Sequence, residues 1–537
     1  MMPGSPNGRP GAGWPAWATL ALAIAGAAGC DGSGGERGAA TGATAERNRE
    51  AVIPPQCYTR TEERFNPCYT CHQTYPDRDR PNVMADGYLQ GDYAFSDFGM
   101  TNRWSNLFRD RSEAVAAVSD REILDYIGQD NYTPLADRLA STGWSGFVPD
   151  LENLHLGHEA FDEHGFARDG SGWVAFNYKP LPSTFWPTNG STDDVMLRLP
   201  ARFRTSSCQG ESSPSIDAYR ANLAILEAAI QDLPAVDSLP VDERAICTDL
   251  DGDGVLRTVD RVVRPSHYVG DASSVPVEVM LYPEGIQFLH TVRYVGVSEE
   301  GEIGPSTRLK ELRYMRKLRS YDRAQLRSLY GNEHQEKREG KLPKAVDTGH
   351  GLDNGFGWLV LGFIEDEQGA LRPQSREEQM FCMGCHTTVG TSIDQTFAFP
   401  RKLPGAEGWG YLDLRGMPDA PNQGETDGEI LTYLERVGGG SEFRNNREMQ
   451  ERWFTATGEV DRRKVEAADV HALITPSPER ALRLNKAYRL IVEEQSFTQG
   501  RDAVVTPPEN VYDQVDPQAV PLPASHRYDW DIRLDWR

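Results

Sequence analysis

The chain has too few basic residues to present a nucleic acid with a cationic surface. Its 537 residues contain 56 lysines and arginines against 80 aspartates and glutamates, which gives a formal net charge of −24. A general nucleic-acid-binding protein needs a basic surface that contacts phosphate, so we expect no nucleic-acid partner. Only 39% of the residues are hydrophobic, which excludes a membrane protein with many spans. The 51 glycines and 35 prolines predict a body rich in loops.

Long apolar runs are also scarce, and one near the N-terminus, at residues 17–28, is too short to cross a bilayer comfortably. It follows Arg9 and ends in small residues before Cys30, which predicts a signal peptide over residues 1–29. This ending resembles a bacterial lipobox, in which Cys30 becomes the lipidated N-terminus. The alternative is ordinary signal-peptide cleavage near Cys30, without lipidation of this cysteine. Residues 30–54 predict a flexible tether. We therefore expect an exported protein at the periplasmic side or cell surface, held to a membrane by an N-terminal lipid.

Four of the eight cysteines fall into two copies of a C-x-x-C-H motif, at residues 68–72 and 382–386. Two thiols at this spacing can bond to the two vinyl groups of one haem, and the adjacent histidine is then delivered as an axial iron ligand. A lone C-x-x-C also suits a redox dithiol or half of a zinc site, but the histidine, the repetition and the expected export favour haem. We predict two covalently bound haem c groups, held by Cys68, Cys71, His72, Cys382, Cys385 and His386.

The sequence around the second motif resembles the c-type cytochromes with class I-like haem domains. Met417 precedes a proline and then a helix-like stretch at 429–434, as in that family's ligand loop and C-terminal helix. Met100 and the stretch 119–127 repeat the pattern more faintly after the first motif. The resemblance implies that Met417 and Met100 are the distal iron ligands. Met84, His155, His158 and His164 remain rivals for the first iron.

This resemblance implies an α+β, loop-rich fold with two mainly helical cytochrome c-like domains flanking an α+β calcium-binding middle domain. The expected units are a first haem domain at 55–130, the middle domain at 131–370, a second haem domain at 371–440, and a helical region with an extended C-terminal tail at 441–537.

Residues 249–260 follow the first eight positions of an EF-hand loop. Calcium needs hard oxygen ligands at such spacings, and Gly254 permits the sharp turn of the loop. The ninth position holds Arg257, and the last holds an aspartate where glutamate is usual, which resembles a dockerin-type loop. We predict one Ca²⁺, against a solvated turn as the alternative, with the ligands Asp249, Asp251, Asp253, the Val255 carbonyl and Asp260.

Two of the remaining cysteines, Cys208 and Cys247, are the candidate disulfide, because export permits oxidation. Cys57 is left over, and the sequence does not choose among the three possible pairings. Residues 286–295 predict a strand in a hairpin with 277–282, and His290 within it is expected to be structural. Residues 308–344 are rich in Lys and Arg and predict an amphipathic helix.

The leading function is an exported di-haem c-type cytochrome that carries electrons between redox partner proteins. The alternative is an oxidoreductase that resembles di-haem cytochrome c peroxidases or their oxygenase relatives, with one haem iron open to peroxide or oxygen. A calcium-stabilised surface binding module is a third possibility. The sequence therefore favours a non-catalytic electron-transfer protein, with a haem peroxidase-like oxidoreductase as the enzyme alternative.

Overall fold

The computed structural model describes residues 52–73, 80–81, 95–182, 189–341, 344–439, 446–528 and 531–536. All of them belong to one compact unit, Arg47–Arg537. The predicted signal peptide, the lipidation site Cys30 and the rival ligand Met84 lie outside the described residues. Among the residues that are described, no helix has the length and apolar character needed to span a bilayer.

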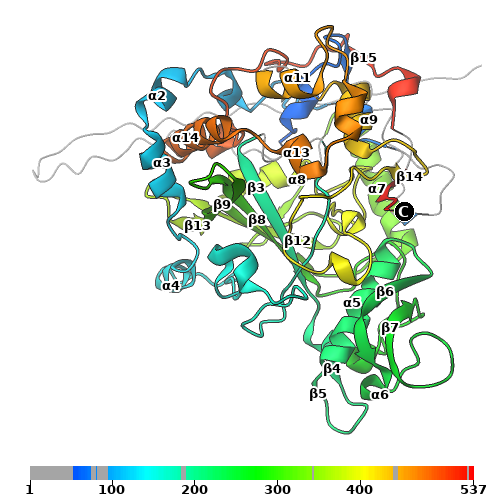
Figure 1. Ribbon diagram of the computed structural model, residues 1–537. Coiled ribbons are helices and arrows are strands. Elements are labelled where there is room, and N and C mark those ends of the chain that lie inside the picture. The colour runs from blue at the N-terminus through cyan, green and yellow to red at the C-terminus, as the bar shows by residue number, and fades with distance from the viewer. Residues whose placement is uncertain are drawn as a thin grey trace, which may run out of the picture. The chain divides into compact units, whose positions relative to one another are not determined.

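An eight-stranded sheet forms the centre of this unit, with the strand order β10-β11-β12-β9-β8-β3-β2 and β13 paired to β12 (Figure 1). Its neighbouring strands are antiparallel. The strands are β2 (Val174–Ala175), β3 (Ser191–Arg198), β8 (Gln287–Val297), β9 (Ile303–Lys317), β10 (Val346–Asp347), β11 (Leu352–Asp353), β12 (Trp358–Glu365) and β13 (Leu371–Pro373).

Both faces of the sheet are covered. Because side chains alternate between faces along a strand, Leu289 and Leu312 enter one apolar cluster and Phe288 and Met315 another. The first cluster includes residues of α4 (Leu135–Ser141), and the second includes residues of α5 (Ile216–Ile230) and α8 (Arg376–Met383). The face toward α8 matters for function, since α8 carries Cys382.

Shorter ribbons and helices surround the sheet. A two-stranded ribbon of β6 (Ala235–Asp242) and β7 (Thr258–Val263) packs on α5. The predicted calcium-binding loop, residues 249–260, leads into β7 and is called the acidic loop below. The other described strands are β1 (Phe65–Asn66), β4 (Thr205–Ser206), β5 (Ser213–Pro214), β14 (Asn422–Gln423), β15 (Val520–Pro521) and β16 (Asp531–Leu534). The other described α-helices are α2 (Ser112–Ala117), α3 (Asp120–Ile127), α6 (Glu243–Ile246), α7 (Arg323–Arg338), α9 (Glu429–Val437), α11 (Arg447–Trp453), α12 (Arg462–Glu466), α13 (Val470–Ile474) and α14 (Pro478–Glu494).

The predicted pair of mainly helical cytochrome c-like domains is wrong. In the first segment, α2 and α3 pack against α14 rather than around the first motif. In the second segment, α8 packs on β12 of the sheet. One apolar cluster runs through the chain from Val52 to Val511. The described helices of both motif segments therefore pack on the sheet or on distant helices, and they do not enclose a separate domain core around each motif.

Two predictions for the middle of the chain are also wrong. Residues 308–317 belong to β9, and the helix begins only at Arg323, where Asp322 forms a capping box. Residues 277–282 form no described strand, and β8 pairs with β9 and β3 instead. A strand that is buried on both faces shows no clear period of two. This explains why the apolar spacing of residues 309–315 imitates a helix.

Candidate haem sites and calcium loop

The two C-x-x-C-H motifs lie against each other, although they are far apart in the sequence. The amide of Thr391 donates a hydrogen bond of 3.2 Å to the carbonyl of Cys71. Gly390 is so close to Gln73 that a Cβ there would overlap the Gln73 carbonyl oxygen and lie 2.6 Å from its amide nitrogen. The segment that follows the second motif therefore packs tightly against the last residues of the first motif and the residue after them.

The first motif begins on a single 3-10 turn, Cys68–Thr70. The amide of His72 donates to the carbonyl of Cys68 at 2.9 Å, which keeps the two cysteines and the histidine on one tight loop. Cys68 is buried in a small cluster that also contains Cys57 and Met100. The structure thus brings the predicted distal ligand Met100 into the same cluster as the first cysteine of the motif.

The second motif follows directly from α8. Ser375 and Glu378 form a capping box at the start of this helix, and Cys382 lies in its last turn. The amide of His386 donates to the carbonyl of Cys382 at 3.0 Å. The side chain of Asn354 donates to the His386 carbonyl at 2.8 Å. Both the amide and the carbonyl of His386 are therefore hydrogen-bonded, which fixes the backbone at the end of the motif.

The His386 ring has the tautomer and the charge that an iron ligand requires. Its Nδ1 lies 2.9 Å from the carbonyl oxygen of Gln395. A carbonyl can only accept, so we assign the proton to Nδ1, which leaves the lone pair on Nε2. Burial lowers the pKa of His386 to about 4, so the ring is neutral at pH 7. Metal-binding histidines typically donate their other ring N–H in this way. The sequence did not single out Gln395.

The cysteines of both motifs are free thiols in a buried setting. Burial raises the pKa of Cys71 to about 11 and that of Cys385 to about 12. The pKa values of Cys57, Cys68 and Cys382 are also raised, in each case chiefly by burial. A low-dielectric site disfavours thiolates. A neutral thioether to haem therefore fits these positions better than a zinc site, which requires deprotonated cysteines.

Met417 lies in a different part of the core from the cysteines. It is buried among residues of α9, α11, α12 and α13, in a cluster that contains none of the motif cysteines. The amide of Val470 donates to its carbonyl at 2.8 Å. Its assignment as a distal ligand stays a prediction.

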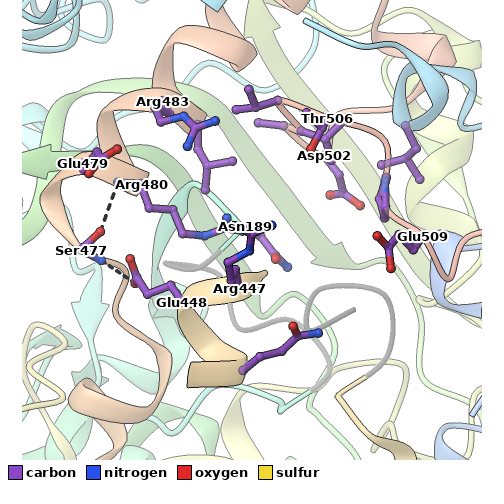
Figure 2. Close-up of a pocket in the computed structure, with 17 residues that line it drawn as sticks. Asn189, Arg447, Glu448, Ser477, Glu479, Arg480, Arg483, Asp502, Thr506 and Glu509 are labelled. Carbon is purple, nitrogen blue, oxygen red and sulfur yellow. Dashed lines mark hydrogen bonds between the residues drawn. The ribbon is translucent and has the colours of Figure 1, made fainter. Parts of the chain in front are cut away.

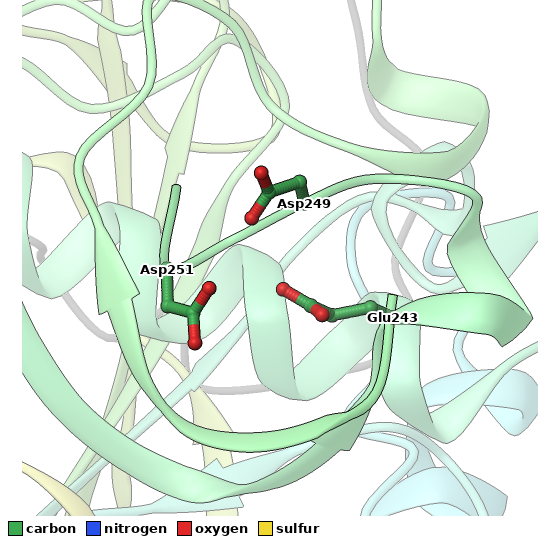
Figure 3. Close-up of side chains that lie close together, drawn as sticks. All are labelled: Glu243, Asp249 and Asp251. Carbon is green, nitrogen blue, oxygen red and sulfur yellow. The ribbon is translucent and has the colours of Figure 1, made fainter. Parts of the chain in front are cut away.

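The acidic loop brings together a different set of carboxylates from the predicted one. Oxygen atoms of Glu243, Asp249 and Asp251 all lie within 4.8 Å of one another (Figure 3). Asp249 accepts the amides of Gly252 and Gly254 at 2.7 and 2.8 Å, which curls the loop around its carboxylate. Glu243, which the sequence analysis missed, comes from α6 and is fully buried.

The other predicted calcium ligands lie outside this cluster. Asp260 is an exposed residue of β7, and the loop connects α6 to β7 rather than two long helices. The expected EF-hand-like arrangement is therefore incomplete. Val255 is 60% exposed. Arg257 donates to Asp251 at 2.5 Å and to Asp253 at 2.8 Å, so its guanidinium neutralises two of the predicted ligands.

Cys208 and Cys247 form a disulfide, with their Cα atoms 5.7 Å apart. The bond joins the loop after β4 to the end of α6, next to the acidic loop. Cys57 carries a free thiol.

A pocket of about 540 Å³ lies between α11, the start of α14 and residues 502–509 (Figure 2). Arg447, Arg480 and Arg483 contribute positive charge to it, and Glu448, Glu479, Asp502 and Glu509 contribute negative charge. Figure 2 shows the Arg480 side chain extending toward Asn189 and Arg447. Burial lowers the pKa of Arg480 to about 10.

This pocket is connected to the second motif through the residue next to Asp502. The guanidinium of Arg501 lies 5.3 Å from the ring centroid of Phe381, which immediately precedes Cys382. Arg501 also donates to the carbonyl of Glu378 in α8. A charged small molecule in the pocket would therefore be close to the helix that carries the motif.

Comparison with known proteins finds a lipoprotein family. A family model described as "-like lipoprotein" matches residues 42–468. The chain is 32% identical over 516 residues to a protein of Aquifex aeolicus (strain VF5) described as "Uncharacterized lipoprotein". The alignment covers 85% of this chain and 86% of that protein. No solved structure matches. These matches and the sheet-rich fold overturn the identification with class I-like cytochromes. The chain belongs to this lipoprotein family.

Proposed function

We propose that the protein transfers electrons through two covalently bound haem c groups on the outer side of a membrane. The observation that carries this proposal is the close approach of the two C-x-x-C-H motifs: Thr391, five residues after His386, donates to the carbonyl of Cys71, and Cys385 is an electrostatic neighbour of Cys71. Motifs that lie this close would hold their two haem groups close together. Electron transfer between centres is fast only over short distances, so this arrangement suits a pair of centres that exchange electrons.

The residues present fit the haem group. Cys68 and Cys71, and likewise Cys382 and Cys385, would form the two thioether bonds of each site, and their burial favours the neutral product. His386 would hold iron through Nε2 while Gln395 keeps its ring oriented. His72 would play the same part in the first motif. Haem supplies a one-electron iron couple whose potential depends on axial ligands and burial.

Location and partners follow from the family and the charge. Membership of a lipoprotein family supports a lipid anchor at Cys30, which precedes the matched residues 42–468. The net charge of −24 suits redox partner proteins with basic docking surfaces.

The test is a haem assay on the exported protein. We expect two haem groups per chain that survive denaturation, measured as the pyridine haemochrome. We also expect that carbon monoxide leaves the spectrum of the reduced protein unchanged, because the gas binds ferrous haem only where a coordination position is vacant or weakly held. If the exported protein contained no covalently bound haem, the proposal would be wrong.

The pocket next to the second motif favours a second candidate, a di-haem oxidoreductase that resembles cytochrome c peroxidases or oxygenases. An electron carrier does not need a pocket of about 540 Å³ lined by Arg447, Arg480 and Arg483. If carbon monoxide shifts the spectrum of one of the two haem groups in the wild-type protein, this candidate takes precedence. The same experiment therefore separates the two functions.

We also propose that the acidic loop binds one Ca²⁺. Glu243, Asp249 and Asp251 supply clustered hard oxygens, and Asp253 lies two residues further along the same loop. The chemistry of this donor set fits calcium rather than a softer metal. Because the loop lies beside the Cys208–Cys247 disulfide, its role would be structural.

Arg257→Gln should increase the affinity for Ca²⁺ several-fold, because the guanidinium competes with the ion for Asp251 and Asp253. Glu243→Gln should weaken binding. Isothermal titration calorimetry with calcium measures both effects. Arg261→Gln is the matched control, since Arg261 also lies on this ribbon but pairs with Asp237 outside the loop. Equal affinities for Arg257→Gln and wild type would contradict the competition.

A further inference from the structure

The face of the sheet toward α8 carries a row of ionisable side chains among apolar ones. In the strand register, His290 of β8 lies directly opposite Arg313 of β9, and Val292 lies opposite both Glu311 and Asp193. Directly opposite residues point to the same face. His290, Arg313, Glu311 and Asp193 therefore share one face of the sheet.

The apolar residues of this face show what covers it. Val195, Leu197, Phe288, Met315 and Val360 belong to the cluster that also contains Met380 and Met383 of α8, with Cys382 packed against it. α8 also packs on β12, so the helix that ends in the second C-x-x-C-H motif covers the same face as the row of ionisable residues.

His290 and Arg313 are close to that motif. Both are electrostatic neighbours of His386, and Cys382 is an electrostatic neighbour of Arg313. The His290 side chain is 29% accessible and that of Arg313 is 33% accessible, whereas Val195, Phe288 and Met315 on this face are buried. The His290 ring is therefore partly accessible from this face of the sheet.

The His290 ring is also oriented as a metal ligand would be. Its Nε2 lies 2.6 Å from Oδ2 of Asp193. A carboxylate that accepts one ring N–H makes the imidazole more basic and fixes its direction, a pattern common behind metal-bound histidines. The 2.6 Å contact assigns Nε2 to Asp193, because the flipped ring would place the carbon Cε1 at that position. Nδ1 is then the ring nitrogen left for a ligand.

We propose that His290 is the distal axial ligand of the haem bound by Cys382, Cys385 and His386, and that Asp193 positions its ring. The inference rests on the proposed function, since it requires haem at the second motif. It replaces Met417, which is enclosed in a cluster to which neither Cys382 nor Cys385 belongs. Two imidazole ligands give a six-coordinate, low-spin iron. Its potential is lower than with a histidine and methionine pair.

The experiment compares His290→Ala with Met417→Leu in the haem-loaded full-length protein. Haem content, measured as the pyridine haemochrome, tests the proposed function separately. We expect two haem groups per chain in the wild type and in both variants. His290→Ala should convert one of them to a high-spin form, seen by electron paramagnetic resonance, and that haem should bind carbon monoxide when reduced. Free imidazole should restore its low-spin spectrum. Met417→Leu should change none of these spectra.

A second variant covers the case in which His290→Ala does not fold. His290→Met keeps a long side chain with a ligating atom, and it should raise the midpoint potential of one haem only. The inference is overturned if the wild type has two haem groups but His290→Ala stays low-spin and inert to carbon monoxide. It is equally overturned if Met417→Leu, rather than His290→Ala, opens one iron. A wild type without covalent haem overturns the inference and the proposed function together.

Discussion

Replacing both cysteines of one motif should halve the covalent haem content of the protein. The variant C382S/C385S should retain one haem per chain, and C68S/C71S should retain the other, because in the proposed function each pair of thiols bonds to one group. Since the motifs are joined through Thr391 and Cys71, loss of one haem should also change the midpoint potential of the other. The pyridine haemochrome measures the content, and a redox titration measures the potential.

Cys57 offers a matched control for this experiment. It is a free and partly buried cysteine in the same cluster as Cys68, but it is not part of a C-x-x-C-H motif. The variant C57S should therefore keep two haem groups per chain. If C382S/C385S retained both groups, or if C57S lost one, the assignment of the motifs would be wrong.

The second large effect is expected from Gly390→Ala. The new Cβ would overlap the carbonyl oxygen of Gln73 and lie 2.6 Å from its amide nitrogen. Both atoms belong to the backbone, so no side-chain rotation relieves the clash and the two motif segments must separate. We expect a loss of about 3 kcal/mol in the free energy of unfolding, measured by urea denaturation.

Gly331→Ala is the control for backbone effects of the substitution itself. Gly331 lies within α7, and no heavy atom would come within 4 Å of its Cβ. An exposed helical glycine replaced by alanine is expected to gain up to about 1 kcal/mol in stability. Equal unfolding midpoints for the two variants would show that Gly390 is not in tight contact with Gln73.

The candidate site was only partly predictable from the sequence. A C-x-x-C-H motif is a local pattern, and its chemistry depends on three side chains within five positions. The Cys208–Cys247 disulfide could be predicted because few cysteines remained to pair outside the two motifs. The contacts of Gln395 with His386 and of Glu243 with Asp249 could not be predicted, since they depend on backbone turns that no short pattern records. His290 was expected to be structural, and only the strand pairing placed it opposite Arg313.

The fold was less predictable than the motifs. The region 308–317 has apolar residues at helical spacing, yet it forms the long strand β9, which pairs with β8 and β12. Contacts with the neighbouring strands outweigh the weak local preference of such a segment. The fold implied by the resemblance to small helical haem domains was wrong for a related reason. The apolar residues around both motifs pack into clusters supplied by distant parts of the chain.

The residues alone determined the positions of the two motifs and of the acidic loop, the candidate disulfide and the acidic charge. Each depends on neighbours within a few positions, or on composition. Only the tertiary structure placed the two motifs close together, brought Glu243 to Asp249 and put His290 on the sheet face that α8 covers. These contacts join residues that are distant along the chain. They depend on how the sheet, its covering helices and the loops pack together to bury their apolar side chains.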